Sequence, residues 1–142
     1  MAPSLHRSTE ADIPELHRIR LSVRENRLSD PARLIEADYR PFIADKGETW
    51  HAEIDGRIAG FGTLDHTDQS IWALFVDPDF EGIGLGKLLL GKLVDRARDS
   101  QMNTISLVTT PGTRAEAFYV RSGWQPAGTA ENGECRLVLT LR

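Results

Sequence analysis

Helical and strand-like spacings of apolar residues divide the chain into successive segments. Over residues 9–26, apolar positions such as Leu16 and Ile19 recur at the spacing of a helix with one buried face. A second helix is predicted after Ser29-Asp30-Pro31, because proline is tolerated in the first turn, and it ends at Lys46-Gly47. The apolar side of this second helix consists of Leu34, Ile35, Tyr39 and Phe42. The first part of the chain therefore predicts two helices.

Three strands are predicted directly after these helices. They cover Thr49–Ile54, Arg57–Leu64 and the apolar run Ser70–Val76. Asp55-Gly56 between the first two is a strong indication of a two-residue hairpin turn. Asp77-Pro78 ends the third strand.

The second half of the chain alternates helices with strands. A leucine-rich stripe that begins at Leu85 predicts a long helix with a broad buried face. The elements expected after it are a strand over Thr104–Thr109, a helix over Thr113–Arg121 and two strands at Trp124–Ala127 and Glu134–Leu141. The order α-α-β-β-β-α-β-α-β-β, with no repeat or linker, predicts a single α/β domain over residues 1–142 with a mixed sheet and helices packed on it.

Composition and charge narrow the class of protein. The 142 residues are 40% hydrophobic and 27% charged, which is typical of a soluble globular protein. A net charge of −4 argues against nucleic acid or an anionic membrane as the main partner. The longest apolar run, Ile71–Val76, is far shorter than the ~20 residues of a membrane helix. The N-terminus has no apolar stretch typical of a signal peptide, so we expect a cytoplasmic protein.

Cysteine and histidine usage excludes two kinds of site. A single cysteine, Cys135, allows neither an internal disulfide framework nor a cysteine-rich zinc module. The four histidines show no metal-ligand spacing, so we predict no metal. No G-x-S-x-G motif occurs, and Cys135 lacks a convincing activating partner, so a covalent nucleophile is not expected.

The segment from Val76 to Lys87 is the strongest candidate for chemistry. A buried strand ends there, three glycines (Gly82, Gly84 and Gly86) alternate with other residues, and a helix begins. Glycines let backbone N–H groups converge on one point, and together with a helix N-terminus they form a site for a phosphate or pyrophosphate.

Two common nucleotide-binding motifs do not fit this loop. A dinucleotide fingerprint would need glycine at Lys87 or Leu89. A P-loop would need glycine at Glu81 and serine or threonine at Leu88. Taken alone, the loop could also be a plain strand-to-helix turn that requires glycine.

Two motifs together resemble the GNAT superfamily, the acyl-CoA-dependent N-acyltransferases. Gly84 and Gly86, placed after Leu74-Phe75-Val76-Asp77-Pro78, are similar to the family's motif A. Arg114 to Trp124 is similar to its motif B, A-x-x-x-Y-x-x-x-G-F, through Ala115, Tyr119, Gly123 and Trp124. The order of elements also matches, so the resemblance covers nearly the whole chain. It implies a mixed, mostly antiparallel sheet flanked by helices and allows a further short N-terminal strand.

The resemblance implies acetyl-CoA as co-substrate and assigns roles to particular residues. The backbone of Leu74–Val76 would pair with the pantetheine arm as an added strand, and the amides of Gly82–Lys87 would hold the pyrophosphate. Phe118 would flank the pantetheine, and Tyr119 would protonate the departing thiolate as the catalytic residue. The implied coenzyme-binding residues are Leu74, Phe75, Val76, Glu81, Gly82, Ile83, Gly84, Leu85, Gly86, Lys87 and Phe118.

The sequence departs from the family pattern at two positions. Glu81 stands where arginine or glutamine is usual, and a carboxylate beside a pyrophosphate is unfavourable by about 1–4 kcal/mol at close range. Lys87, Arg114 and Arg121 could offset it in part. Gly112 stands where many members carry an asparagine that contacts the coenzyme, so no side-chain contact is carried over there.

The general base and the acceptor remain open at this level. Five side chains could serve as the base through a water chain or be ordinary surface groups: Glu53, His51, Asp65, His66 and Glu134. In the family the acceptor pocket is shaped by the first two helices and the last strands, which here offer Arg20, Arg24, Arg27, Tyr39, Trp50 and His51. The three arginines lie at helical spacing and could bind a substrate carboxylate or phosphate, or form a solvated face.

The function expected from this resemblance is transfer of an acetyl group from acetyl-CoA to a primary amine by direct attack. The expected acceptor is a small molecule. Two alternatives are a protein or peptide N-acetyltransferase and a non-catalytic acyl-CoA-binding module on the same fold. The resemblance also implies a homodimer, formed through the C-terminal strands, because many members of the family are dimers.

Overall fold

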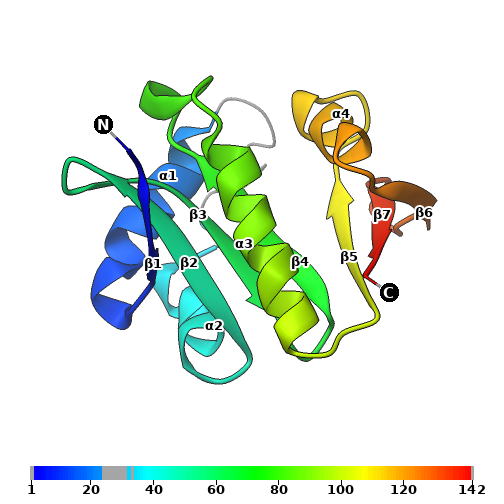
Figure 1. The fold of residues 1–142 in the computed structure, drawn as a ribbon, viewed down its shortest axis with the longest axis horizontal. Helices are drawn as coiled ribbons and strands as arrows, with labels where there is room; N and C mark the ends of the chain where they lie inside the picture. Colours follow the sequence, from blue (N-terminus) through cyan, green and yellow to red (C-terminus); the bar gives the residue numbers. More distant parts are fainter. Residues whose placement is uncertain (1, 24–31, 33, 142) are drawn as a thin grey trace.

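The computed structural model describes residues 2–23, 32 and 34–141, in which one seven-stranded sheet runs through the molecule (Figure 1). The strand order is β1-β2-β3-β4-β5-β7-β6. Every neighbouring pair is antiparallel except β4 with β5, so the predicted mixed, mostly antiparallel sheet is confirmed. The strands are β1 (Ser4–Arg7), β2 (Gly47–Ile54), β3 (Arg57–Asp65), β4 (Ser70–Val76), β5 (Thr104–Thr109), β6 (Gln125–Thr129) and β7 (Cys135–Thr140). The short N-terminal strand that the resemblance allows is β1.

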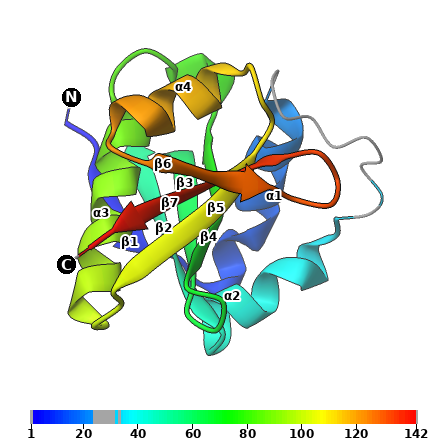
Figure 2. The same ribbon diagram turned by 90° about the vertical axis from the view of Figure 1, so that its right-hand side faces the viewer.

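Helices cover both faces of the sheet (Figure 2). α1 (Ile13–Ser22) and α2 (Arg40–Ala44) lie on one face, and α3 (Leu85–Asp99) and α4 (Arg114–Arg121) lie on the other. Short 3-10 turns precede three of these helices: η1 (Glu10–Asp12), η3 (Glu36–Tyr39) and η4 (Pro78–Phe80). No helix in the described part of the chain is long and apolar enough to cross a membrane.

The two N-terminal helices differ from their predicted bounds. α1 begins at Ile13, after the turn η1, and ends at Ser22, where Val23 becomes extended, so the helix predicted up to Asn26 is shorter than expected. In the second helix, Ile35 is extended and 54% exposed, so it does not belong to the predicted apolar side. Its N–H donates to Asp38 Oδ2 at 2.8 Å, and the carboxylate therefore caps a helical region that begins at Glu36. Ser29-Asp30-Pro31, the predicted start, lies outside the described residues.

The predicted hairpin between β2 and β3 is present. Asp55 and Gly56 both have positive φ, 52° and 79°, as a type I′ turn requires, and Ile54 pairs with Arg57 across it. The strand predicted over Thr104–Thr109 matches β5 at both ends.

The parallel pair β4–β5 meets at one register position, Ser70 with Ser106. From there the strands separate toward Val76, as Figure 1 shows. Side chains rather than a backbone ladder fill the space between the two parts of the sheet. The buried cluster that joins them includes Leu64, Leu90, Leu93, Ile105, Leu107, Trp124 and Leu137.

A buried carboxylate fixes α3 to β2. Glu48 is 1% exposed and accepts hydrogen bonds from Arg96 Nε (2.7 Å) and Trp50 Nε1 (2.8 Å), and His66 Nε2 lies 2.7 Å from it. Burial opposes ionisation, but these hydrogen bonds outweigh it and lower the pKa of Glu48 from 4.5 to about 2. The C-terminal half of α3 is therefore held on the sheet by a charged network as well as by apolar packing.

Candidate active site

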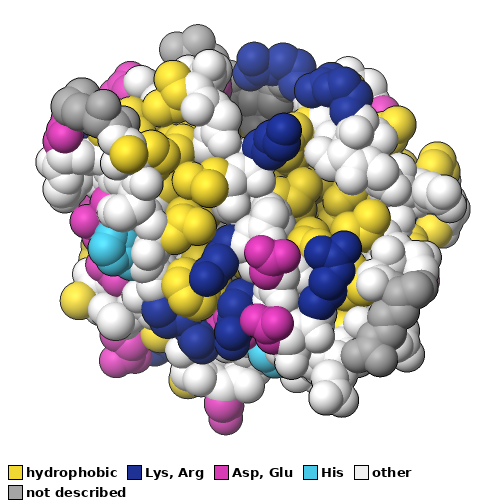
Figure 3. Space-filling view, viewed as in Figure 1, with side chains coloured by type: hydrophobic (Ala, Val, Ile, Leu, Met, Phe, Trp, Pro, Cys, Tyr) yellow, Lys and Arg dark blue, Asp and Glu magenta, His cyan; other side chains and the backbone are white. Residues whose placement is uncertain are grey.

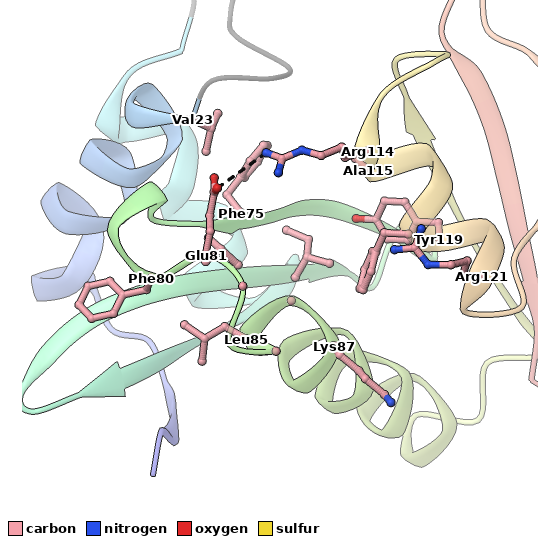
Figure 4. A pocket seen from close by; sticks show the side chains of 16 residues that line it. Val23, Phe75, Phe80, Glu81, Leu85, Lys87, Arg114, Ala115, Tyr119 and Arg121 are labelled. Atoms are coloured by element: carbon pink, nitrogen blue, oxygen red, sulfur yellow. Dashed lines mark ion pairs between the residues drawn. The ribbon is translucent and has the colours of Figure 1, made fainter. Parts of the chain in front are cut away.

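A cavity of about 540 Å³ opens where β4 ends and the sheet divides (Figure 4). Its walls come from the end of β4, the β4–α3 loop, the first turn of α3 and one side of α4. The residues that line it are Val23, Leu74, Phe75, Val76, Phe80, Glu81, Gly82, Gly84, Leu85, Gly86, Lys87, Arg114, Ala115, Phe118, Tyr119 and Arg121. All the coenzyme-binding residues expected from the sequence are in this set except Ile83, whose side chain is 59% exposed.

The loop before α3 is shaped to present backbone N–H groups. Gly84 is the N-cap of α3 with φ 87°, a left-handed conformation that residues with a Cβ rarely adopt. The first N–H groups of α3 have no partner within the helix, and they stand at the positive end of its dipole. This geometry suits an anion such as a pyrophosphate.

Asp77 anchors the start of this loop. It is 2% exposed, its Oδ1 accepts from the Asp79 N–H at 2.9 Å, and Arg18 Nη1 donates to its Oδ2 at 3.1 Å. The sequence identifies Asp77-Pro78 as the end of a strand but gives no indication of the contact with Arg18, because the two residues are far apart along the chain. α1 therefore helps to position the loop from the opposite face of the sheet.

The cavity is cationic although the protein as a whole is acidic. Lys87, Arg114 and Arg121 line it against one carboxylate, Glu81. Lys and Arg side chains lie around an apolar surface between α3 and α4 (Figure 3). Arg114 Nη2 is 3.8 Å from Glu81 Oε2, and this ion pair reaches across the mouth of the cavity (Figure 4). The negative charge of Glu81 is therefore offset in part by its direct ion pair with Arg114, as the sequence predicts.

Tyr119 is the buried polar group of the cavity wall. It is 6% exposed, and its hydroxyl points from α4 into the cavity (Figure 4). Its ring packs edge-on against Phe118 and Trp124, with centroid distances of 5.3 and 5.7 Å. Burial raises the pKa of the Tyr119 hydroxyl above its ordinary value of 10, so the group stays protonated at neutral pH.

The turn into α4 is held without a side chain at position 112. Gly112 has φ 78°, and its N–H donates to Glu116 Oε1 at 2.9 Å. Glu116 Oε2 accepts from Cys135 Sγ at 3.1 Å, and burial and this carboxylate raise the pKa of the Cys135 thiol. The thiol is therefore a hydrogen-bonded packing group near the site.

None of the five candidate bases lines the cavity. His51, on β2, contacts Ser8 Oγ at 2.7 Å and Glu53 Oε2 at 2.9 Å. Asp65 accepts from two backbone N–H groups, and His66 contacts Glu48. Glu134 lies in the β6–β7 turn. Among the described residues, no group of histidine, cysteine, aspartate or glutamate could hold a metal ion.

Of the candidate acceptor residues, Arg20 lies beside the cavity wall. Its guanidinium carbon is 4.4 Å from the ring centroid of Phe75. Arg24 and Arg27 lie outside the described residues. Tyr39 is buried and hydrogen-bonds to His17 Nδ1 at 3.0 Å, whereas Trp50 and His51 lie on β2 and do not line the cavity. Three further lining residues were not predicted as binding residues: Phe80 and Ala115, which lie within the two motif segments, and Val23, which no motif marks.

Comparison with known proteins gives a consistent picture of the fold. Residues 12–124 match the model of the acetyltransferase (GNAT) family. An uncharacterized N-acetyltransferase, ycf52, of Pyropia yezoensis is 31% identical over 75 residues, which cover 51% of this chain and 42% of the relative. The chain thus matches less than half the length of that relative.

Two solved structures share the fold over almost the whole chain. An acetyltransferase of the GNAT family from Staphylococcus aureus Mu50 has a TM-score of 0.85 at 19% identity, covering 99% of this chain and 100% of that one. The PaiA N-acetyltransferase from Thermoplasma acidophilum, solved in complex with coenzyme A, has a TM-score of 0.77 at 14% identity and covers 99% of both chains.

Proposed function

Because the chain belongs to the acetyltransferase (GNAT) family, we propose that it transfers an acetyl group from acetyl-CoA to a primary amine by direct attack. The acceptor that we propose is a small molecule. The observation that carries the proposal is the cavity itself, where an anion-binding loop, three cationic side chains and the Tyr119 hydroxyl meet.

The residues of the cavity fit acetyl-CoA in three respects. The N–H groups at the start of α3 suit its pyrophosphate, and Lys87, Arg114 and Arg121 complement its phosphate charge. The apolar side chains of Leu74, Phe118 and their neighbours suit the pantetheine arm. A volume of about 540 Å³ lies within the ordinary range of ligand sites.

In this reaction the protein positions the amine against the thioester carbonyl and stabilises the charge that develops on the carbonyl oxygen. When bound, acetyl-CoA supplies a thioester that is already activated toward amines. Because β4 separates from β5, backbone groups of Leu74–Val76 have no partner on that side among the described strands, so one N–H can polarise the carbonyl. The apolar walls exclude water and hold the amine close to the carbonyl.

Tyr119 is our proposed general acid. Its buried hydroxyl is a weaker acid than a free phenol, so it acts first as a hydrogen-bond donor to the sulfur on which negative charge develops. Proton transfer completes the departure of the thiolate. The phenolate that this leaves is re-protonated when the amine product releases its proton.

Two measurements test the proposal. Calorimetric titration should detect micromolar binding of acetyl-CoA, and Gly84→Arg should weaken it strongly because a side chain then occupies the loop. Tyr119→Phe should lower kcat about 100-fold at saturating acetyl-CoA, with coenzyme affinity nearly unchanged. An unchanged transfer rate in Tyr119→Phe would refute its role as the acid.

A non-catalytic acyl-CoA-binding module is a second candidate, because Glu81 and Gly112 both depart from the family pattern, whereas the Tyr119 hydroxyl in the cavity argues against it. Binding of acetyl-CoA without transfer to any member of an amine and peptide panel would support this candidate. Transfer to peptides but to no small amine would instead indicate a protein-modifying enzyme.

A further inference from the structure

Arg20 stands out among the half-buried arginines because its guanidinium is incompletely paired. Its Nη1 atom is buried and has no hydrogen-bond partner in the described part of the chain. Arg18, two residues before it, donates to Glu15 at 2.9 Å and to Asp77 at 3.1 Å. Arg96 is bonded to Glu48. The fold thus provides carboxylates for these two arginines, whereas a donor of Arg20 has no partner among the described residues.

The guanidinium of Arg20 adjoins the wall of the cavity. It lies over the ring of Phe75, at 4.4 Å from the centroid, and Phe75 itself lines the cavity. Val23, three residues further along the chain, also lines the cavity, and Figure 4 shows Val23 and Phe75 near each other in its wall. Arg20 therefore lies on the α1 face of the sheet, beside the end of β4 where that strand is no longer paired with β5.

The charges around Arg20 favour binding of a small anionic group, such as a carboxylate on a molecule that also carries an amine. Burial lowers the pKa of Arg20, but an arginine remains charged at neutral pH. Glu134, from the β6–β7 turn, is close enough to act on this charge, yet it does not form an ion pair with it and instead accepts from Asn132 Nδ2 at 2.6 Å. The neighbouring Tyr39 hydroxyl is occupied by His17. A planar carboxylate suits one guanidinium, and Glu134 disfavours a doubly charged phosphate.

We propose that Arg20 binds the carboxylate of the amine acceptor, so that the enzyme acetylates amines that carry a carboxylate a few bonds from the nitrogen. This inference rests on the proposed acetyl transfer and names its substrate class. Free amino acids and peptides with an acidic side chain near the N-terminus both present this chemistry. Phe75, which contacts Arg20 and lines the cavity, would then set the distance from the carboxylate to the reacting amine.

Matched acids and amides provide the test. The acceptors are alanine, glutamate, phenylalanine and lysine, each beside its carboxamide, and the peptides alanyl-glutamyl-glycine amide and alanyl-glutaminyl-glycine amide. We expect the parent protein to prefer the acid of a pair by about 10- to 100-fold in kcat/KM, chiefly through KM. In Arg20→Gln the ratio should fall to about one, and Arg20→Lys should retain part of it.

Arg40→Gln is the control, since Arg40 lies on the same face of the sheet and is exposed. It should keep the preference of the parent protein. Equal rates for acid and amide in the parent protein, or an undiminished preference in Arg20→Gln, would overturn the proposal. A preference confined to the free amino acids or to the peptide pair identifies which source of the carboxylate the site accepts.

Binding measurements separate this inference from the proposed reaction. If no amine is acetylated, the same acids are titrated calorimetrically into protein saturated with coenzyme A. Binding of acids but not amides, lost in Arg20→Gln, would support the carboxylate site although the transfer proposal fails. Absence of any such binding, in protein that binds coenzyme A, would refute the Arg20 site.

Discussion

The Glu81 carboxylate and the Arg114 guanidinium neutralise each other at the mouth of the cavity. They come from opposite walls, the β4–α3 loop and the first turn of α4, and their side chains are 36% and 75% exposed. An exposed pair of this kind contributes at most about 1 kcal/mol. The pair matters for coenzyme binding instead, because Glu81 would repel a bound pyrophosphate and Arg114 would attract it.

Removing the Glu81 charge should therefore tighten coenzyme binding. We expect Glu81→Gln to lower the Kd of acetyl-CoA about 3- to 10-fold, because repulsion disappears and Arg114 becomes available to the phosphates. Arg114→Gln should raise the Kd by a similar factor. Calorimetry of both variants and of the double variant measures the coupling, with Glu36→Gln, an exposed carboxylate outside the cavity, as control. A Kd that rises in Glu81→Gln would show that the carboxylate helps to hold the coenzyme.

At the scale of elements, the attachment of α3 to β2 makes stability depend on pH. The folded-state pKa of Glu48 lies below its ordinary value, so its ionised form stabilises the fold at neutral pH. This stabilisation is complete above about pH 5 and is lost as the pH falls toward 2. A shift of this size corresponds to about 3 kcal/mol in the free energy of unfolding.

Glu48→Gln should unfold more easily than the parent protein at pH 7, by about 3 kcal/mol, and the difference should shrink toward pH 2. Urea denaturation at several pH values, followed by circular dichroism, measures it. Glu131→Gln, an exposed carboxylate in the β6–β7 turn, should show no comparable change. A difference that is the same at pH 2.5 and pH 7 would show that packing, rather than charge, is the important property of Glu48.

Elements with strong local patterns could be predicted from the sequence, whereas contacts between distant residues could not. The Asp55-Gly56 turn and the strand Thr104–Thr109 follow from local chemistry, and the structure contains both. Ile35 fits a helical stripe by spacing alone, but the Asp38 carboxylate starts the helix one residue later. The backbone loop and Tyr119 could be located because they belong to motifs. The contacts of Arg18 with Asp77 and of Arg20 with Phe75 join residues more than 50 positions apart, and periodicity contains no information about them.

At the scale of the whole molecule, a net charge of −4 coexists with a cationic cavity. The local field around Lys87, Arg114 and Arg121 should attract an anionic coenzyme despite the acidic remainder of the surface. Added salt screens this attraction, because the screening length falls from about 14 Å at 50 mM to about 4 Å at 500 mM salt.

The affinity for acetyl-CoA should consequently fall about tenfold between 50 and 500 mM sodium chloride. Acetyl-pantetheine, which lacks the phosphates, should bind with less than about a twofold change over the same range. Calorimetry or a competition assay measures both. Equal salt dependence of the two ligands would show that the three cations do not contact the phosphates.

β4 and β5 pair at a single register position, Ser70 with Ser106, so the junction between the two parts of the sheet is mechanically weak. α3 packs on β2, β3 and β4, so the proposed coenzyme loop belongs to one side of this junction. α4, which carries Tyr119, connects β5 to β6 on the other side. Backbone ladders resist shear within each side, whereas apolar packing, which has no fixed direction, joins the sides. Tension across the sheet would therefore separate Tyr119, the proposed proton donor, from the proposed coenzyme loop before any strand unravelled.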